Sequence, residues 1–200
     1  MPAPSPVQKV MEQTSMVTLL ALLIAQRKVF YGINQLIREW KVGTGVKRRT
    51  SQGLVREGWV QCSLEFDWTK KSDVMGAAWM VKNDRGMVLE HSRRAFVGVL
   101  SLHQAKLKVW LWVFESMRSL RKKKVVFVST AEDIVEAIER PTLSPALQYE
   151  AEEIKSGLKA FEAWELRIGG LEAVRSVYFI AKSVRSLGMM QSYVAAGHPR

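Results

Sequence analysis

The stretch WVQCSLEFDW, from Trp59 to Trp68, alternates apolar and polar side chains from Val60 onward. A period of two predicts a β-strand with one buried and one solvated face. The next stretch, VMGAAWMVKNDRGMVLEHSRRAF (Val74–Phe96), predicts two more strands joined by a turn at residues 83–86. Residues 59–96 therefore predict three strands in an antiparallel meander.

The meander is followed by SLHQAKLKVWLWVFESM (Ser101–Met117), which has a helical period. Steps of three and four place one stripe of side chains on a single helix face: Leu102, Lys106, Val109, Val113, Met117 and Leu120. Lys106 is the one polar member, and burial of an unpaired ammonium is costly. We therefore expect Lys106 to pair with Glu65 or to reach water.

The rest of the chain alternates strands and helices. KVVFVS (Lys124–Ser129) is a short apolar run typical of a buried parallel strand. A short helix follows, with Ser129 and Glu132 at capping-box spacing, and a second helix with Ser144 as N-cap and Pro145 as its first residue. AWELRI (163–168) predicts a last strand before a final helix. The predicted fold is α/β, with a mixed five-stranded sheet (the meander plus two parallel strands) flanked by helices.

Residues 1–58 differ from residues 59–200 in their pattern of apolar and polar residues. We predict an N-terminal helical extension, ending in a basic linker, before a single α/β domain from residue 59. The longest apolar run, MVTLLALLIA (Met16–Ala25), is shorter than the ~20 residues that span a bilayer, so we expect no membrane partner. Cys62 is the one cysteine. Because no intramolecular disulfide can form, we expect an intracellular location, in the nucleus or the cytoplasm.

The net charge of +11 is unevenly distributed. Residues 91–124 carry nine Lys and Arg against one acid, whereas residues 125–172 carry ten acids against four cations. A basic pole is typical of a polyanion site, although the charge alone is better explained by a solvated face that keeps the protein soluble. The candidate nucleic-acid-binding residues are Arg93, Arg94, Lys108, Arg118, Arg121, Lys122, Lys123 and Lys124.

Several stretches resemble one known family: WVQCSLEFDW, GAAWMVKNDRGMVLEHSRRAF, WVFESMRSL, KKVVFVSTAEDIVEAI, FIAKSV and QSYVAAGHP. Together they resemble the reverse-transcriptase-associated, retroelement-derived RNase H-like domains of plants, in the ribonuclease H superfamily. The resemblance runs from about Trp59 to Pro199. It implies an RNase H fold and a nucleic-acid partner, either an RNA–DNA hybrid or another duplex.

Members of this family that cut RNA use four carboxylates to hold two Mg²⁺ ions. The resemblance places these four positions at Glu65, Lys106, Thr130 and Tyr178, of which only Glu65 is an acid. A lysine at such a position would repel Mg²⁺. The resemblance thus implies a degenerate, catalytically inactive nucleic-acid-binding domain with no cofactor, in which Glu65 is the metal ligand if there is any.

Two alternatives stand beside this interpretation. The first is an active Mg²⁺-dependent ribonuclease that cleaves RNA–DNA hybrids, and the second is a structural relic that binds nothing. Three of the four positions also have a purely structural explanation: Glu65 as a strand-end charge, Thr130 as a helix N-cap or the neighbour of one, and Tyr178 as a core or rim aromatic. The remaining candidates for chemistry give no spacing that predicts a site: Asp67, Glu115, Glu132, Asp133, His103 and His198.

Overall fold

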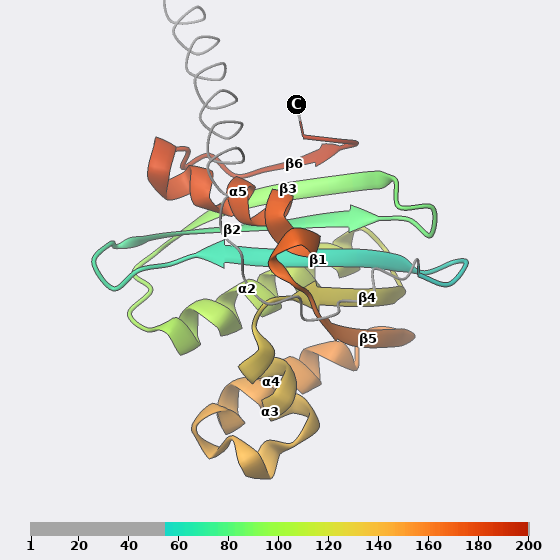
Figure 1. The fold of residues 1–200 in the computed structure, drawn as a ribbon, viewed down its shortest axis with the longest axis horizontal. Coiled ribbons are helices and arrows are strands. Elements are labelled where there is room, and N and C mark those ends of the chain that lie inside the picture. The colour runs from blue at the N-terminus through green and yellow to red at the C-terminus, as the bar shows by residue number, and fades with distance from the viewer. Residues whose placement is uncertain (1–54, 200) are drawn as a thin grey trace, which may run out of the picture. The chain divides into compact units, whose positions relative to one another are not determined.

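A computed structural model describes residues 55–199 of the chain, which form an α/β domain with a six-stranded mixed sheet. The sheet order is β5-β4-β1-β2-β3-β6 (Figure 1). The elements are β1 (Val60–Asp67), β2 (Val74–Lys82), β3 (Val88–Val97), α2 (Leu102–Ser119), β4 (Lys124–Ser129), α3 (Glu132–Glu139), the 3₁₀ helices η2 (Pro141–Leu143) and η3 (Pro145–Leu147), α4 (Gln148–Leu158), β5 (Ala163–Ile168), α5 (Leu171–Leu187) and β6 (Tyr193–Ala196). The predicted N-terminal helical extension and most of the basic linker lie outside the described residues.

The predicted meander is confirmed. β1 pairs with β2, and β2 with β3, both in antiparallel register. The connecting turn begins at Asn83, whose side-chain oxygen accepts hydrogen bonds from the backbone N–H groups of Arg85 (3.1 Å) and Met87 (2.9 Å). Gly86 takes a positive φ of 76° in this turn, a conformation that glycine adopts without steric cost.

The parallel part of the sheet is also confirmed, since β4 pairs in parallel with both β1 and β5. The predicted strand count is wrong, however, because β6 adds a sixth strand antiparallel to β3. β6 has only four residues and no long alternating pattern, so its strand conformation depends on its partner. The Ser92 hydroxyl donates to the carbonyl of Tyr193 (2.5 Å), and His91 Nδ1 lies 2.9 Å from the carbonyl oxygen of Gly197.

Helices cover both faces of the sheet (Figure 1). α2 packs on one face, where Trp110, Val113 and Met117 join the main hydrophobic core with Leu64 of β1 and Phe127 of β4. On the opposite face α5 packs against β2 through a smaller apolar cluster. Among residues 55–199, no helix combines the length and hydropathy that crossing a bilayer requires.

Helix starts differ from the sequence-based prediction at two of three places. α2 begins as its pattern indicates, with Ser101 as the N-cap accepting the N–H of Gln104 (3.1 Å). α3 has Ala131 as its N-cap. The Ser129 hydroxyl oxygen instead accepts a hydrogen bond from the N–H of Ala131 (3.2 Å), which closes the turn after β4. Ser144 precedes a 3₁₀ turn and makes no capping bond, so α4 starts only at Gln148.

Close contact between β2 and α5 depends on Gly76. A methyl group at this position would lie 2.0 Å from the carbonyl oxygen of Ala181 and 2.7 Å from the Cβ of Val184. Both atoms belong to rigid parts of α5, so a side chain on residue 76 would force the helix away from the sheet. The helix that carries Tyr178 is therefore positioned by a residue without a Cβ.

We predict that Gly76→Ala destabilises the domain. Alanine in place of a strand glycine ordinarily stabilises by about 0.5–1 kcal/mol, but overpacking here should cost about 1–3 kcal/mol. Chemical denaturation of the parent and the variant measures the difference in unfolding free energy. An equal or higher stability of the variant would contradict the close packing of β2 and α5.

Candidate functional site

A pocket of about 280 Å³ opens where β1 and β4 end. It is lined by Glu65, Phe66, Lys106, Thr130, Ala131, Asp133, Leu171, Val174 and Tyr178. Since β1 and β4 run parallel, their carboxyl ends meet at the same edge of the sheet. This edge is where open α/β sheets commonly bind ligands.

All four positions that the resemblance singles out line this one pocket. Glu65 comes from β1, Lys106 from α2, Thr130 from the residue after β4 and Tyr178 from α5. Residues that are 113 positions apart in sequence, from 65 to 178, are thus brought together by the sheet and by the two helices on its opposite faces. The four positions therefore form one cluster in space.

Glu65 is buried in the cluster, with only 5% of its surface exposed. Its carboxylate accepts the backbone N–H of Thr130 at 2.8 Å, which joins the end of β1 to the residue that follows β4. Burial raises the pKa of the Glu65 carboxyl, and hydrogen bonds from Thr130 and Phe66 offset only part of this increase. Glu65 therefore acts as a hydrogen-bond acceptor within the fold.

Lys106 is 8% exposed, and its ammonium donates to the carboxylate of Asp133 in an ion pair. The expectation that it pairs with Glu65 is wrong. Asp133 lies in the first turn of α3, where an acid is favourable to the helix dipole, and from there it reaches over the pocket toward α2. From the sequence, an acid at position 133 can be explained by the helix dipole. No sequence signal indicates that the carboxylate of Asp133 contacts Lys106.

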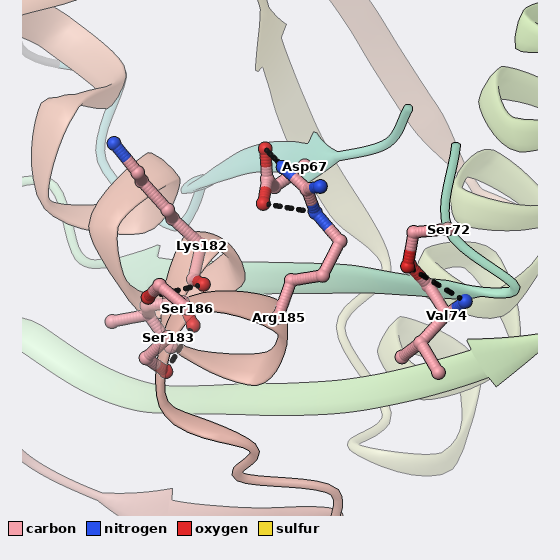
Figure 2. Close-up of polar contacts among 8 residues, drawn as sticks. Asp67, Ser72, Val74, Lys182, Ser183, Arg185 and Ser186 are labelled. Atoms are coloured by element: carbon pink, nitrogen blue, oxygen red, sulfur yellow. Dashed lines mark hydrogen bonds and ion pairs between the residues drawn. The ribbon is translucent and has the colours of Figure 1, made fainter. Parts of the chain in front are cut away.

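Tyr178 is half-buried beside this pair of charges. Burial raises the pKa of its phenol, and the nearby Asp67 carboxylate raises it further. Asp67 itself does not line the pocket. Arg185 extends from α5 and binds it through two hydrogen bonds of 2.8 and 3.1 Å, as Figure 2 shows.

The other acids considered from the sequence do not complete a metal site. Glu115 and Glu132 are exposed and absent from the pocket lining. Within residues 55–199, no three His, Cys, Asp or Glu side chains come together as metal ligands. The pocket holds two carboxylates, one of them already neutralised by an ammonium. Because Mg²⁺ requires several oxygen ligands around it, the residues present do not fit the two-metal arrangement.

The candidate basic residues separate into three groups. Arg93 is buried, and it donates to Ser183 Oγ (3.2 Å) and to the carbonyl of Gln191 (3.3 Å), so it is not available at the surface. Lys122 and Lys123 lie in ion pairs with Glu90 (2.8 Å) and Glu162 (2.7 Å). The remaining five make no ion pair with any described residue and are exposed or half-buried: Arg94, Lys108, Arg118, Arg121 and Lys124.

Comparison with known proteins shows the fold. No family model matches the sequence, and no curated protein matches it. Solved structures that are similar include an RNase H1 from the halophilic archaeon Halobacterium salinarum, with 9% identity, a TM-score of 0.57 and coverage of 64% of this chain and 98% of that chain. LC9-RNase H1 is described as a type 1 RNase H with the type 2 active-site motif. It has 14% identity and a TM-score of 0.53, and the match covers 72% of this chain and 79% of that chain.

A third similar structure is the N-terminal RNase H domain of a Mycobacterium tuberculosis protein. It has 11% identity and a TM-score of 0.50, and the match covers 64% of this chain and 94% of that chain. At such identities a structural match carries information about the fold alone. The described part of the chain therefore has an RNase H-like fold.

We predict that the two partners of the pocket ion pair differ in their effect on stability. The Lys106 side chain is 10% exposed and that of Asp133 is 45% exposed. Asp133→Asn leaves a buried ammonium without its counter-charge and should cost about 1–3 kcal/mol, whereas Lys106→Met leaves a carboxylate that reaches water and should cost less. Unfolding free energies of both variants and of the double variant test this. A greater destabilisation by Lys106→Met than by Asp133→Asn would contradict the asymmetry.

Proposed function

We propose that this domain binds nucleic acid through a basic surface and does not cleave it, as a degenerate RNase H-like domain. The observation that carries the proposal is the ion pair of Lys106 with Asp133 inside the pocket. The sequence resemblance supports an origin among the retroelement-derived RNase H-like domains of plants. It also supports a duplex, such as an RNA–DNA hybrid, as the partner.

Loss of hydrolysis follows from the charges of the pocket. A two-metal mechanism places two divalent cations a few ångströms apart and requires anionic oxygens to hold them. Lys106 supplies a positive charge instead, and it neutralises Asp133, one of the two carboxylates in the lining. Thr130 and Tyr178 contribute only hydroxyl groups, which are weaker ligands for hard cations than carboxylates.

Nucleic-acid binding is supported by the placement of the remaining cations. Residues 55–199 carry 21 Lys and Arg and 17 Asp and Glu, so the domain as a whole is nearly balanced. Ten of these acids lie in residues 125–172, on the segment from α3 to the start of α5. Within α2 and the turn before β4, Lys106, Lys122 and Lys123 are paired with acids. Lys108, Arg118, Arg121 and Lys124 remain to supply a local positive charge suited to a phosphate backbone.

Both alternatives remain as outcomes of experiments. An active ribonuclease would require a cation in the pocket to displace the Lys106 ammonium from Asp133. A structural relic would keep the fold and the ion pairs, and its basic residues would serve solubility only. A cleavage assay distinguishes the active ribonuclease from the proposed binding domain, and a binding assay distinguishes the structural relic from it.

We predict no cleavage of an RNA–DNA hybrid by the purified protein in the presence of Mg²⁺ or Mn²⁺, because the pocket offers no carboxylate cluster. Labelled hybrid resolved on denaturing gels is the measurement. Glu65→Gln is the matched control, since it removes the one acid retained at a family position. Metal-dependent cleavage by the parent that disappears in Glu65→Gln would establish the nuclease alternative.

We predict weak, largely sequence-independent binding that falls steeply with salt, because release of counterions dominates the interaction of cations with phosphates. Arg121→Gln with Lys124→Gln should make the plot of log K against log salt shallower by about one unit for each phosphate that the variant no longer neutralises. The control is Lys70→Gln with Lys71→Gln, an equal decrease in charge after the carboxyl end of β1, at the opposite end of the sheet from Lys124.

Fluorescence anisotropy with a labelled duplex gives both slopes. Equal slopes for the two double variants would show that the effect depends on net charge and not on this surface. If the parent protein shows no binding at low salt, the domain is a relic.

A further inference from the structure

β5 is an outer strand of the sheet, with β4 as its one strand partner among the described residues. All six residues of β5 are at least partly exposed, whereas five of the six residues of β4 are buried. Trp164 and Ile168 are 42% and 43% exposed. A strand with an apolar, exposed outer edge is a ready template for pairing with another strand.

The hydrogen bonds to β4 determine which backbone groups of β5 point outward. The N–H of Ala163 donates to the carbonyl of Lys123 (3.3 Å), and the N–H of Gly169 donates to that of Ser129 (2.9 Å). Because consecutive residues of a strand direct their backbone groups to opposite sides, Glu165 and Arg167 also face β4. The N–H and C=O groups of residues 164, 166 and 168 therefore point away from the sheet.

The sequence of β5 is self-complementary about Leu166. Glu165 and Arg167 flank Leu166 on either side, and Trp164 and Ile168 flank that pair. In an antiparallel pair of two such strands centred on Leu166, each Glu165 lies opposite an Arg167, and each Trp164 lies opposite an Ile168. Opposite charges and large apolar side chains facing each other across strands both stabilise a sheet.

We propose that β5 is the interface for a second copy of this chain, joined edge to edge around a two-fold axis at Leu166. The outward backbone groups of Trp164, Leu166 and Ile168 then meet the same groups of the partner strand as hydrogen-bonded pairs. Glu165 and Arg167 fall at the alternate, non-hydrogen-bonded pairs, where opposite side chains are closest. The two sheets become one continuous sheet.

Charge selects this register against its neighbours. The outward backbone groups allow the pairing to slide only so that even-numbered residues stay opposite one another. A slide of two residues in one direction places Glu165 opposite Glu165 of the second copy. A slide of two residues in the other direction places Arg167 opposite Arg167 of the second copy. Like charges directly opposite destabilise a strand pair, so both adjacent registers are disfavoured relative to the register centred on Leu166.

The side chains are already arranged for such an exchange. Glu165 accepts a hydrogen bond from Arg167 of its own strand at 2.7 Å, and this contact lowers the pKa of the Glu165 carboxyl. Both charges thus lie on the same face of the strand. A single strand pair buries much less than the ~800 Å² per partner of a standard interface, so the association should be weak and reversible, with a dissociation constant of about 10 μM or above.

Sedimentation equilibrium of the full chain over a range of concentrations tests the proposal, together with a set of charge variants. Glu165→Arg alone and Arg167→Glu alone each place like charges opposite one another in the homodimer, and each should raise the dissociation constant about tenfold or more. The double variant, Glu165→Arg with Arg167→Glu, exchanges the two charges and should associate like the parent. An equimolar mixture of the two single variants should form heterodimers, because two arginines then face two glutamates.

Amide hydrogen exchange on the unmodified chain gives an independent readout that needs no substitution. The N–H groups of Leu166 and Ile168 should exchange more slowly at high than at low protein concentration, while that of Glu165, already bonded to β4, should not change. A chain that stays monomeric at all concentrations would overturn the proposal. So would dimers that both single variants leave unchanged, or the absence of concentration-dependent protection at Leu166.

Discussion

The parallel pairing of β1 with β4 is the constraint that determines where the side chains of the pocket lie. It brings the carboxyl ends of the two strands together, so that the Glu65 carboxylate can accept the N–H of Thr130. α2 and α5 pack on opposite faces of the sheet near this edge and supply Lys106 and Tyr178. A change of one residue in the register of β1 against β4 would point Glu65 to the other face, because side chains alternate along a strand.

The elements with strong periodicity can be predicted from the sequence. The alternation in β1, the turn at Asn83 and the apolar run of β4 each specify their own conformation locally, and the structure agrees. β6 cannot be predicted in this way, since its four residues form a strand only through the hydrogen-bonding groups that β3 offers. The same holds for the 3₁₀ turns of residues 141–147, because capping residues and prolines signal a helix start without specifying the type of helix that follows.

A similar distinction applies to the pocket. Glu65, Lys106, Thr130 and Tyr178 are identified by family resemblance, whereas periodicity alone shows only the anomaly of a lysine on an apolar stripe. The partner of that lysine depends on how far the first turn of α3 extends over the pocket, which is a property of tertiary packing. Arg93 shows the converse case, in which a residue counted with the surface cations is enclosed between β3, α5 and the following segment.

The position of β6 has a consequence for the order in which the sheet can form during synthesis. β3 ends at Val97 and β6 begins at Tyr193, so 95 residues intervene between these paired strands. At about 5–20 residues per second, the edge of β3 stays unpaired for roughly 5–20 s after it is made. Throughout that interval the nascent chain presents an open edge that invites pairing with other chains, and a chaperone that shields β3 would have its greatest effect before residue 193 is translated.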